Sequence, residues 1–459
     1  MRDSKHVTII GGGISGLACA YRLKELNLPV TLLEASERVG GLVGTFRKDG
    51  FLFESGPQSF LGTEEILDLI AKLGISSELL EADPQAPRFI LREGKLQKVP
   101  MSPPGLLTSS LLGARSRWKI VSEPFRRTKP PDSEETIADF VRRKFGHEIL
   151  EYLVAPFVSG VYAGDPEKLS LRAAFPSLEE WEREHGSILR GAMKSRPNKG
   201  KCKGPPPLCS FQTGVERLIR ALSDSLGDSI RTKTRVVSIT RSEHIGNKAH
   251  EIRIARDGHE ETLPAHTLVL ATPAYTASHL VNSISPPLAQ ALSGIAYAPV
   301  GVVAAGYYER QIRKSTNGFG FLVPRRERVR TLGTVYSSSL FPGRAPQSMT
   351  ELTSFVGGAT DPEIVAKHEK GIETIVVREN AHILDIEGVP TVARVWMHPK
   401  ALPQYNLGHG HIIKLIRDSE REIPGLFFAG NYLEGPSLGK CVEQAFKTAD
   451  AVRDYIQCS

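Results

Sequence analysis

The chain has 459 residues and a formal net charge of +7, with 40% hydrophobic and 24% charged residues. This length can bury a large core and predicts two or three domains, and the composition is that of a globular protein. The charge suits an anionic lipid surface or an acidic substrate, but no basic module with interleaved aromatic residues predicts binding to nucleic acid.

The first predicted unit is a strand, a glycine-rich turn, a helix and a second strand. The apolar run Val7 to Ile10 predicts a buried parallel strand, residues 17–26 predict a helix, and Val30 to Leu33 predict a second strand that ends in Glu34. Gly-x-Gly-x-x-Gly spacing between the first strand and the helix is typical of a site that binds a dinucleotide pyrophosphate at a helix N-terminus. The expected contacts are Gly11, Gly12, Gly13, Ile14, Ser15 and Gly16.

An extension of this motif identifies the dinucleotide. Glu34 is expected to bind the adenosine ribose, and Ala35, Arg38, Gly41 and Leu42 follow it directly. The extended pattern resembles the flavoprotein family of amine oxidases, phytoene desaturases and protoporphyrinogen oxidases, which implies FAD. Within that motif Arg38 is expected to offset phosphate charge; alone, it would be a solvated surface arginine. No evident flavinylation motif with cysteine or histidine occurs, so we expect the FAD to be non-covalent.

The following stretch predicts a hairpin over 44–53 with Gly50 at its turn, and then a glycine–proline loop. The resemblance implies that this loop passes the flavin and that Gly56, Pro57, Gln58 and Ser59 contact the cofactor. The alternative is a plain turn. A second hairpin is expected from Arg88 to Pro100.

Residues 99–113 are apolar and rich in proline, and Arg115, Arg117 and Lys119 follow them. An apolar face beside basic residues can lie in a membrane interface, but a helix packed under the domain fits equally well. Residues 120–200 are expected to be mainly helical, with a loop from Ala155 to Asp165, and 194–207 read as a linker.

The rest of the chain returns to the cofactor domain. Strands are expected over 230–239, 250–254 and 266–271, and a strand-rich second sheet over 298–358. The resemblance places a cofactor contact at Val236 and further contacts at Gly430, Pro436, Ser437 and Leu438. A helix expected from about Leu438 would direct its positive N-terminal end at the flavin ring.

The motifs together resemble the family of FAD-dependent protoporphyrinogen oxidases over nearly the whole chain. The more specific ones are the 155–165 segment, Gly318-Phe-Gly-Phe-Leu-Val-Pro and Leu332-Gly-Thr-Val-Tyr. The expected fold is α/β, with a Rossmann-type FAD-binding domain, a mixed-sheet substrate domain and a helical, membrane-associating region. The expected segments are 1–87, 210–275 and 395–459 for FAD, 88–100 and 276–394 for substrate, and 101–209 for the helical region.

The resemblance also implies a reaction and a pocket. Protoporphyrinogen IX would be oxidised to protoporphyrin IX with dioxygen as acceptor, six electrons leaving in three hydride-transfer rounds. Arg88 would pair with a substrate propionate, and apolar walls would come from Phe319, Gly320, Leu322, Val335 and Phe355. By itself Arg88 reads as an exposed hairpin arginine. The alternatives are a coproporphyrinogen III oxidase, an amine oxidase or carotenoid desaturase, and a flavin-binding regulatory protein.

No motif demands a protein general base or a metal, so no catalytic residue and no metal site are predicted. The pair His409 and His411 reads as two loop histidines rather than ligands. The odd number of cysteines, five, fits a reducing compartment. A cytoplasmic location is expected, with the cytoplasmic face of a membrane and a second copy of the chain as candidate partners.

Overall fold

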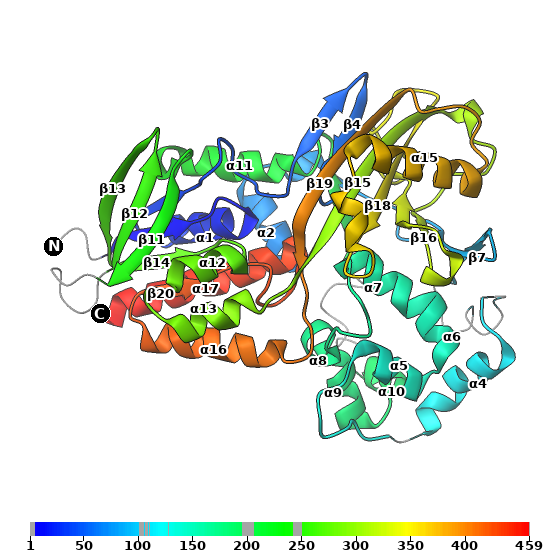
Figure 1. The fold of residues 1–459 in the computed structure, drawn as a ribbon, viewed down its shortest axis with the longest axis horizontal. Coiled ribbons are helices and arrows are strands. Elements are labelled where there is room, and N and C mark those ends of the chain that lie inside the picture. The colour runs from blue at the N-terminus through cyan, green and yellow to red at the C-terminus, as the bar shows by residue number, and fades with distance from the viewer. Residues whose placement is uncertain are drawn as a thin grey trace.

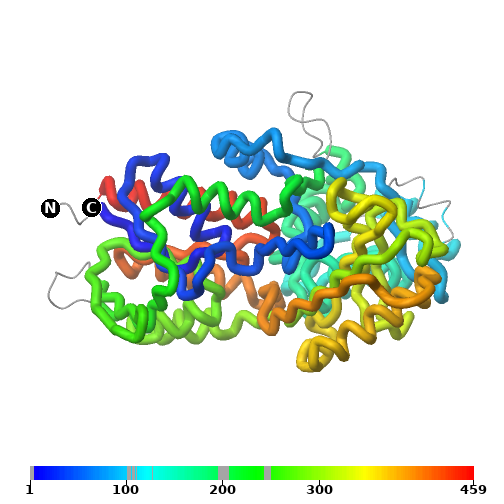
Figure 2. The backbone as a smooth tube through the Cα atoms, turned by 90° about the horizontal axis from the view of Figure 1, so that it is seen from above, coloured from blue at the N-terminus to red at the C-terminus, as the bar shows by residue number. Residues whose placement is uncertain are grey.

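The computed structural model describes residues 5–100, 105, 109, 111–126, 128–194, 206–241 and 250–458. The molecule is elongated (Figure 2): the first (blue) and last (red) segments lie at one end, and the yellow to orange sheet lies at the other. Two large sheets dominate these two ends, and a group of short helices lies below the second sheet (Figure 1).

The first sheet is entirely parallel and has five strands. In spatial order they are β10 (Ile230–Arg231), β2 (Val30–Leu33), β1 (Val7–Ile10), β14 (Thr267–Leu270) and β20 (Leu426–Phe428). β1 and β2 have the predicted bounds, because short apolar β-branched runs have few alternatives to a buried strand. The predicted strand over 230–239 is divided in two, since Lys233 has a φ of +53°.

Both faces of this sheet are covered. One face packs against α1 (Ile14–Glu25), α2 (Glu64–Lys72), α11 (Glu216–Leu226) and α17 (Leu438–Cys458). The other packs against α12 (Ala274–Val281), α13 (Pro286–Ser293), α16 (His409–Glu422) and a small antiparallel sheet of β11 (Arg235–Arg241), β12 (His250–Arg256) and β13 (His259–Ala265). This is a doubly covered α/β layer structure, as predicted.

The second sheet is mixed and has seven strands. Its order is β19 (Val392–Pro403), β15 (Tyr297–Tyr308), β18 (Met349–Gly357), β17 (Thr331–Val335), β16 (Gly320–Leu322), β7 (Arg88–Arg92) and β8 (Lys95–Lys98). The hairpin of β7 and β8 was predicted, and it joins the sheet through a parallel pair with β16. Helix α15 (Glu369–Leu384) packs on this sheet.

Two smaller sheets connect the halves. The predicted hairpin is β3 (Thr45–Lys48) and β4 (Phe51–Glu54). The second small sheet is made of β5 (Phe60–Leu61), β9 (Leu208–Phe211) and β6 (Leu79–Glu81).

The helical region is made of short helices around its own apolar core. They are α4 (Ala114–Ser122), α5 (Ile137–Lys144), α6 (His147–Ile149), α7 (Ala155–Tyr162), α8 (Leu171–Ala174), α9 (Pro176–His185) and α10 (Ile188–Lys194). The predicted loop from Ala155 to Asp165 is wrong, because residues 155–162 form α7. Pro156 sits in the first turn of that helix, where proline is tolerated.

Leu111 and Leu112 are almost completely buried in this core, whereas Leu106 and Leu107 lie outside the described residues. Of the two alternatives for the apolar run before Arg115, packing within the protein therefore holds for Leu111 and Leu112, and a membrane-facing position does not. Within the part of the chain that the structure describes, no helix combines the length and the apolar character needed to cross a bilayer.

Candidate functional site

A cavity of about 440 Å³ lies at the carboxyl ends of the parallel strands. Ligands of doubly wound α/β proteins bind at this edge of the sheet, and the volume is within the usual range for a ligand site. The wall draws on segments that are far apart in sequence: the loop after β1, the end of β2, β11, the loop after β14, β19 and residues 430–441.

The glycine-rich turn has the conformation that a phosphate site requires. Gly11 has a φ of +110°, and a Cβ on Gly16 would lie 1.9 Å from the Gly11 carbonyl oxygen, so both positions need glycine. A Cβ on Gly13 would meet no atom within 4 Å, because that position faces the cavity. Helix α1 begins at Ile14 with no side-chain cap, which leaves its first N–H groups available to an anion.

Glu34 is fixed at the rim by three hydrogen bonds. Its Oε2 accepts from the Gly12 amide at 2.7 Å, and its Oε1 accepts from the amide and hydroxyl of Ser36 at 2.8 and 2.7 Å. Oε2, with a single donor, keeps a lone pair for a further donor. The carboxylate is thus oriented before any ribose hydroxyl arrives.

Arg38 holds the loop around residues 40–43 in place. Its guanidinium donates to the carbonyls of Gly41 and Val43, both at 2.9 Å, and the Gly40 amide donates to Gly12. Gly41 and Leu42 line the cavity together with Ala35, whereas Arg38 is not one of the lining residues. A contact between Arg38 and phosphate stays a prediction.

The glycine–proline loop contributes Pro57 to the cavity wall. The Gln58 amide turns back and donates to the carbonyls of Glu54 and Gly56, and a Cβ on Gly56 would lie 2.1 Å from the Leu42 carbonyl oxygen. Gly56, Gln58 and Ser59 are not among the lining residues, so their contacts with a cofactor stay predictions.

Three of the four residues expected as C-terminal contacts line the cavity, and their contacts with a cofactor stay predictions. Gly430, Pro436 and Leu438 line the cavity, and α17 begins at Leu438. Ser437 immediately precedes that helix: its hydroxyl accepts from the Lys440 amide and its carbonyl from the Cys441 amide. Val236 lines the same cavity from β11.

The predicted substrate residues lie beside one another in the second sheet. Gly320 pairs with Arg88 in β7 on one side and with Val335 in β17 on the other. The Arg88 guanidinium lies over the Phe319 ring at 4.9 Å, and Phe355 pairs with Gly333 in the next strand. Leu322 points to α7, where a Cβ on Gly160 would come within 2.8 Å of it. None of the six is a lining residue of the cofactor cavity.

Several lining residues were not predicted: Thr272, Tyr275, Tyr297, Lys400, Ala401, Leu402 and Asn431. The Thr272 hydroxyl is buried and has no hydrogen-bond partner among the described residues, which fits a ligand in the cavity. Its position directly after a buried parallel strand could have identified it. No sequence signal marks Lys400, which comes from the second sheet.

Comparison with known proteins gives consistent matches over the whole chain. The model of the family described as flavin containing amine oxidoreductase matches residues 14–453. Chloroplastic protoporphyrinogen oxidase of Oryza sativa is 36% identical over 99% of this chain and 89% of its own. Coproporphyrinogen III oxidase of Bacillus subtilis is 28% identical over 98% of each.

Solved structures agree with these matches. A crystal structure from Exiguobacterium sp. 255-15, of a protein provisionally assigned as a protoporphyrinogen oxidase, is 26% identical with a TM-score of 0.82, covering 98% of this chain and 99% of that one. Reduced UDP-galactopyranose mutase has a TM-score of 0.72 at 15% identity, over 98% and 96% of the two chains, and shares the fold.

Proposed function

The chain belongs to the family of flavin-containing amine oxidoreductases, and from this premise we propose that it oxidises protoporphyrinogen IX to protoporphyrin IX in porphyrin biosynthesis. It is an FAD-dependent oxidoreductase. The observation that carries the choice of substrate is identity of 36% or 37% to plant protoporphyrinogen oxidases over at least 98% of the chain.

FAD is held, in this proposal, by the residues that line the cavity. Gly13 and the first turn of α1 receive the pyrophosphate, Glu34 the adenosine ribose, and Val236 the adenine. The N-terminus of α17 faces the flavin ring, where its positive end favours negative charge. When bound, FAD supplies the acceptor for hydride from the porphyrinogen and the route for electrons to dioxygen.

The tetrapyrrole would lie against the strands β16, β17 and β18. Phe319, Leu322, Val335 and Phe355 are half-buried, as side chains at the edge of a pocket are. Arg88 is exposed at the same edge of the sheet and can hold a carboxylate bidentately. A large apolar macrocycle with carboxylates at one edge matches this combination of walls and cation.

In our proposal, the residues of this chain orient the substrate and do not exchange protons with it. Tyr275 and Tyr297 stay neutral because burial raises the pKa of each phenol. His409 donates to the Tyr432 carbonyl, and burial lowers its pKa. It lies in α16 and not in the loop that the sequence indicated. We assign no catalytic residue.

Coproporphyrinogen III is the second candidate substrate. The identity of 28% to the Bacillus subtilis and Staphylococcus aureus enzymes covers 98% of the chain and supports it. Its four propionates would need several cations at the pocket, whereas the walls proposed here are apolar apart from Arg88. This difference favours protoporphyrinogen.

We propose adjusted domain boundaries. The expected boundary at residue 395 falls inside β19, which pairs with β15 up to Pro403, so the substrate domain extends to about that residue. Helices α12 and α13 pack on the cofactor sheet, so that domain extends beyond residue 275. The expected end of the helical region at residue 209 falls inside β9, which pairs with β5 and β6, so that region ends before Leu208.

We also propose that the protein is cytoplasmic and that the helical region rests on a membrane surface. Trp118, Val121 and Phe125 are 66%, 49% and 80% exposed, although each is large and apolar. Arg115 is exposed in the same helix, so an anionic headgroup could pair with it. A homodimer stays a prediction.

One experiment tests the reaction. The purified yellow protein is given protoporphyrinogen IX or coproporphyrinogen III under air, and porphyrin fluorescence is followed. We expect rapid oxidation of protoporphyrinogen with a clear preference over coproporphyrinogen. The reverse preference would select the second candidate, and no oxidation of either with full flavin content would reject both.

A further inference from the structure

We propose that Lys400 is a cofactor-retaining residue, a cation that the substrate sheet contributes to the cofactor cavity and that binds the pyrophosphate of FAD. Lys400 lies in β19 and lines the cavity together with Ala401 and Leu402. The proposal depends on FAD occupying the cavity and not on which porphyrinogen is oxidised.

Without Lys400, the charges around the cavity would not neutralise a bound pyrophosphate. Among the described residues that line it, the charged side chains are Glu34, Arg235 and Lys400. The N-terminus of α1 offers the equivalent of about half a positive charge, less than a pyrophosphate dianion requires. Arg38 donates to backbone carbonyls and does not line the cavity. Arg235 lies in β11 beside Val236, where we propose that the adenine binds. Lys400 is the remaining cation among the described residues of the wall.

The order of the strands places Tyr275, over whose ring Lys400 lies, beside the strand that leads into the glycine-rich turn. Glu34 follows β2 and Gly13 follows β1, so the ribose and the pyrophosphate occupy the ends of these neighbouring strands. Tyr275 follows β14, which pairs with β1 on its other side. Adjacent strands are about 4.8 Å apart, a distance that a lysine side chain can span.

Two tyrosine rings packed edge to face support the ammonium group of Lys400. Lys400 Nζ lies over the Tyr275 ring, 4.4 Å from its centroid. Tyr275 packs edge-on against Tyr297 at 5.0 Å, and the Tyr297 hydroxyl accepts from the Ala274 amide at 2.9 Å. A cation on an aromatic face loses some of its freedom before the ligand arrives. The Tyr275 ring thus orients Lys400.

Loss of FAD from the holoenzyme tests this proposal. Free flavin fluorescence after dilution gives the rate of release for wild type, Lys400→Met, Lys400→Arg, Tyr275→Phe and Tyr275→Leu. We expect Lys400→Met to release FAD on the order of tenfold faster, as loss of one charged hydrogen bond would allow. Lys400→Arg and Tyr275→Phe should stay within about twofold of wild type, and Tyr275→Leu should be intermediate.

The chain offers a matched control in Arg394, a cation on the same strand that stacks on the Phe46 ring at 4.9 Å and does not line the cavity. Arg394→Met should release FAD at the wild-type rate. Raising the ionic strength from about 0.01 M to 0.15 M should reduce the difference in the rate of FAD release between wild type and Lys400→Met, because salt screens an exposed charge.

The midpoint potential of the bound flavin shows which part of the cofactor Lys400 contacts, the pyrophosphate or the flavin ring. Lys400→Met should leave it unchanged, because the pyrophosphate is equally charged in both redox states. A lower potential with wild-type release would place Lys400 at the flavin ring and overturn the proposal. Wild-type release by Lys400→Met, or equally fast release by Lys400→Arg, would also overturn it. Porphyrinogen oxidation is a separate measurement.

Discussion

Gly13 and Gly16 are three residues apart in one turn, yet they have different roles. A Cβ on Gly13 would enter the cavity without touching protein, whereas one on Gly16 would overlap the Gly11 carbonyl. The first glycine therefore serves the ligand, and the second serves the packing of α1 on β1.

This difference gives a prediction. Gly13→Val should fold normally and be purified without FAD, because its side chain occupies the space of the pyrophosphate. Gly16→Val should unfold or aggregate. Flavin absorbance and thermal unfolding of both variants are the measurements, and a yellow Gly13→Val protein would remove the pyrophosphate from this position.

Arg88 carries the second prediction at this scale. If it holds a propionate, Arg88→Ala should lower kcat/KM for protoporphyrinogen on the order of tenfold to a hundredfold, since a charged hydrogen bond contributes roughly 1.5–3 kcal/mol. Arg88→Lys should recover part of this loss, because an ammonium lacks the planar fork. Flavin content should not change.

Lys98 is the control for Arg88, since it is an exposed cation on the neighbouring strand β8. Lys98→Ala should have wild-type kinetics. If Arg88→Ala also stays within about twofold of wild type, Arg88 is a surface residue and the tetrapyrrole pocket loses its cation.

Individual site residues were predictable where one local motif specifies them. Gly11 to Gly16 and Glu34 follow from a strand, turn and helix that are continuous in sequence. Lys400 could not be found in this way, because its contact with Tyr275 joins strand β19 to helix α12, and the two residues are 125 positions apart in the sequence. Only tertiary packing creates that part of the wall.

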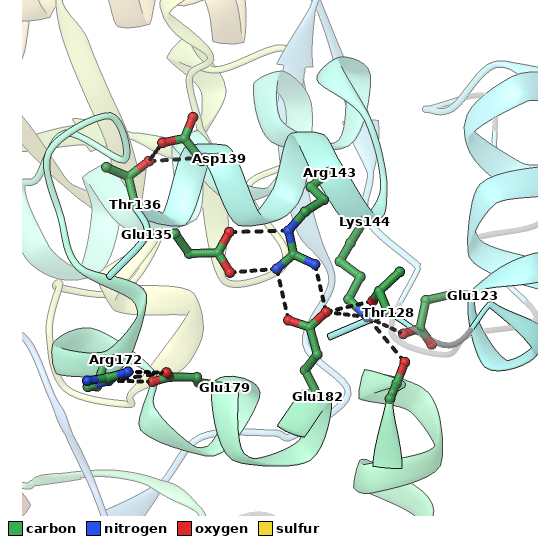
Figure 3. A network of polar contacts seen from close by, with 11 residues as sticks. Glu123, Thr128, Glu135, Thr136, Asp139, Arg143, Lys144, Arg172, Glu179 and Glu182 are labelled. Carbon is green, nitrogen blue, oxygen red and sulfur yellow. Dashed lines mark hydrogen bonds and ion pairs between the residues drawn. The ribbon is translucent and has the colours of Figure 1, made fainter. Parts of the chain in front are cut away.

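At the scale of elements, α9 and α5 are joined by a buried polar network (Figure 3). Glu182 accepts from both Nη atoms of Arg143 at 2.7 and 2.9 Å, from Lys144 at 2.9 Å and from Thr128 at 2.6 Å. Burial alone would raise the pKa of Glu182, but these donors outweigh it and lower the pKa to about 2.

The network predicts how stability depends on pH. The folded pKa of Glu182 lies below its ordinary value of 4.5, so its contribution is complete at neutral pH and is lost as the pH falls from about 5 toward 2. Glu182→Gln should lower the free energy of unfolding by roughly 3 kcal/mol at pH 7. The difference in the free energy of unfolding between this variant and wild type should become smaller as the pH falls.

Urea denaturation followed by tryptophan fluorescence measures this effect, since Trp118 and Trp181 belong to the same region. Glu179→Gln on the same helix is the control. Its partner Arg172 is 59% exposed, so the pair should contribute under about 1 kcal/mol. Equal losses in the two variants, or a gap that does not change with pH, would contradict the assignment.

Elements differ in how far local sequence specifies them. The strands β1 and β2 and both hairpins were predicted, because apolar runs and turn glycines are local signals. Helix α7 was taken for a loop: its Pro156 and Gly160 disfavour a helix, but Gly160 is where the helix meets Leu322 of β16. β19 was missed because it carries Pro399 and Pro403, which an edge strand tolerates.

At the scale of the molecule, two long strands carry the chain between its halves. β15 starts and β19 ends beside the cofactor cavity. The two strands run side by side through the second sheet (Figure 1). Tyr297 at the start of β15 and Leu402 near the end of β19 both line the cavity. A displacement of the substrate sheet can therefore be transmitted to the wall of the cofactor cavity along these continuous strands, without an intervening loop.

The last prediction concerns the face of the helical region. Of its exposed apolar side chains, Trp118 lies in α4 and Phe125 ends the short 3₁₀ helix that follows it, and Lys119 and Arg115 are near them in the chain. Burying such aromatic groups in a lipid interface is favourable, and basic residues add attraction to anionic headgroups. The double variant Trp118→Ser, Phe125→Ser should thus lose flotation with anionic liposomes. Val389→Ser, which removes a 74% exposed apolar residue far along the chain, should float like wild type. Flotation of the double variant at the wild-type level would exclude this face as the attachment site.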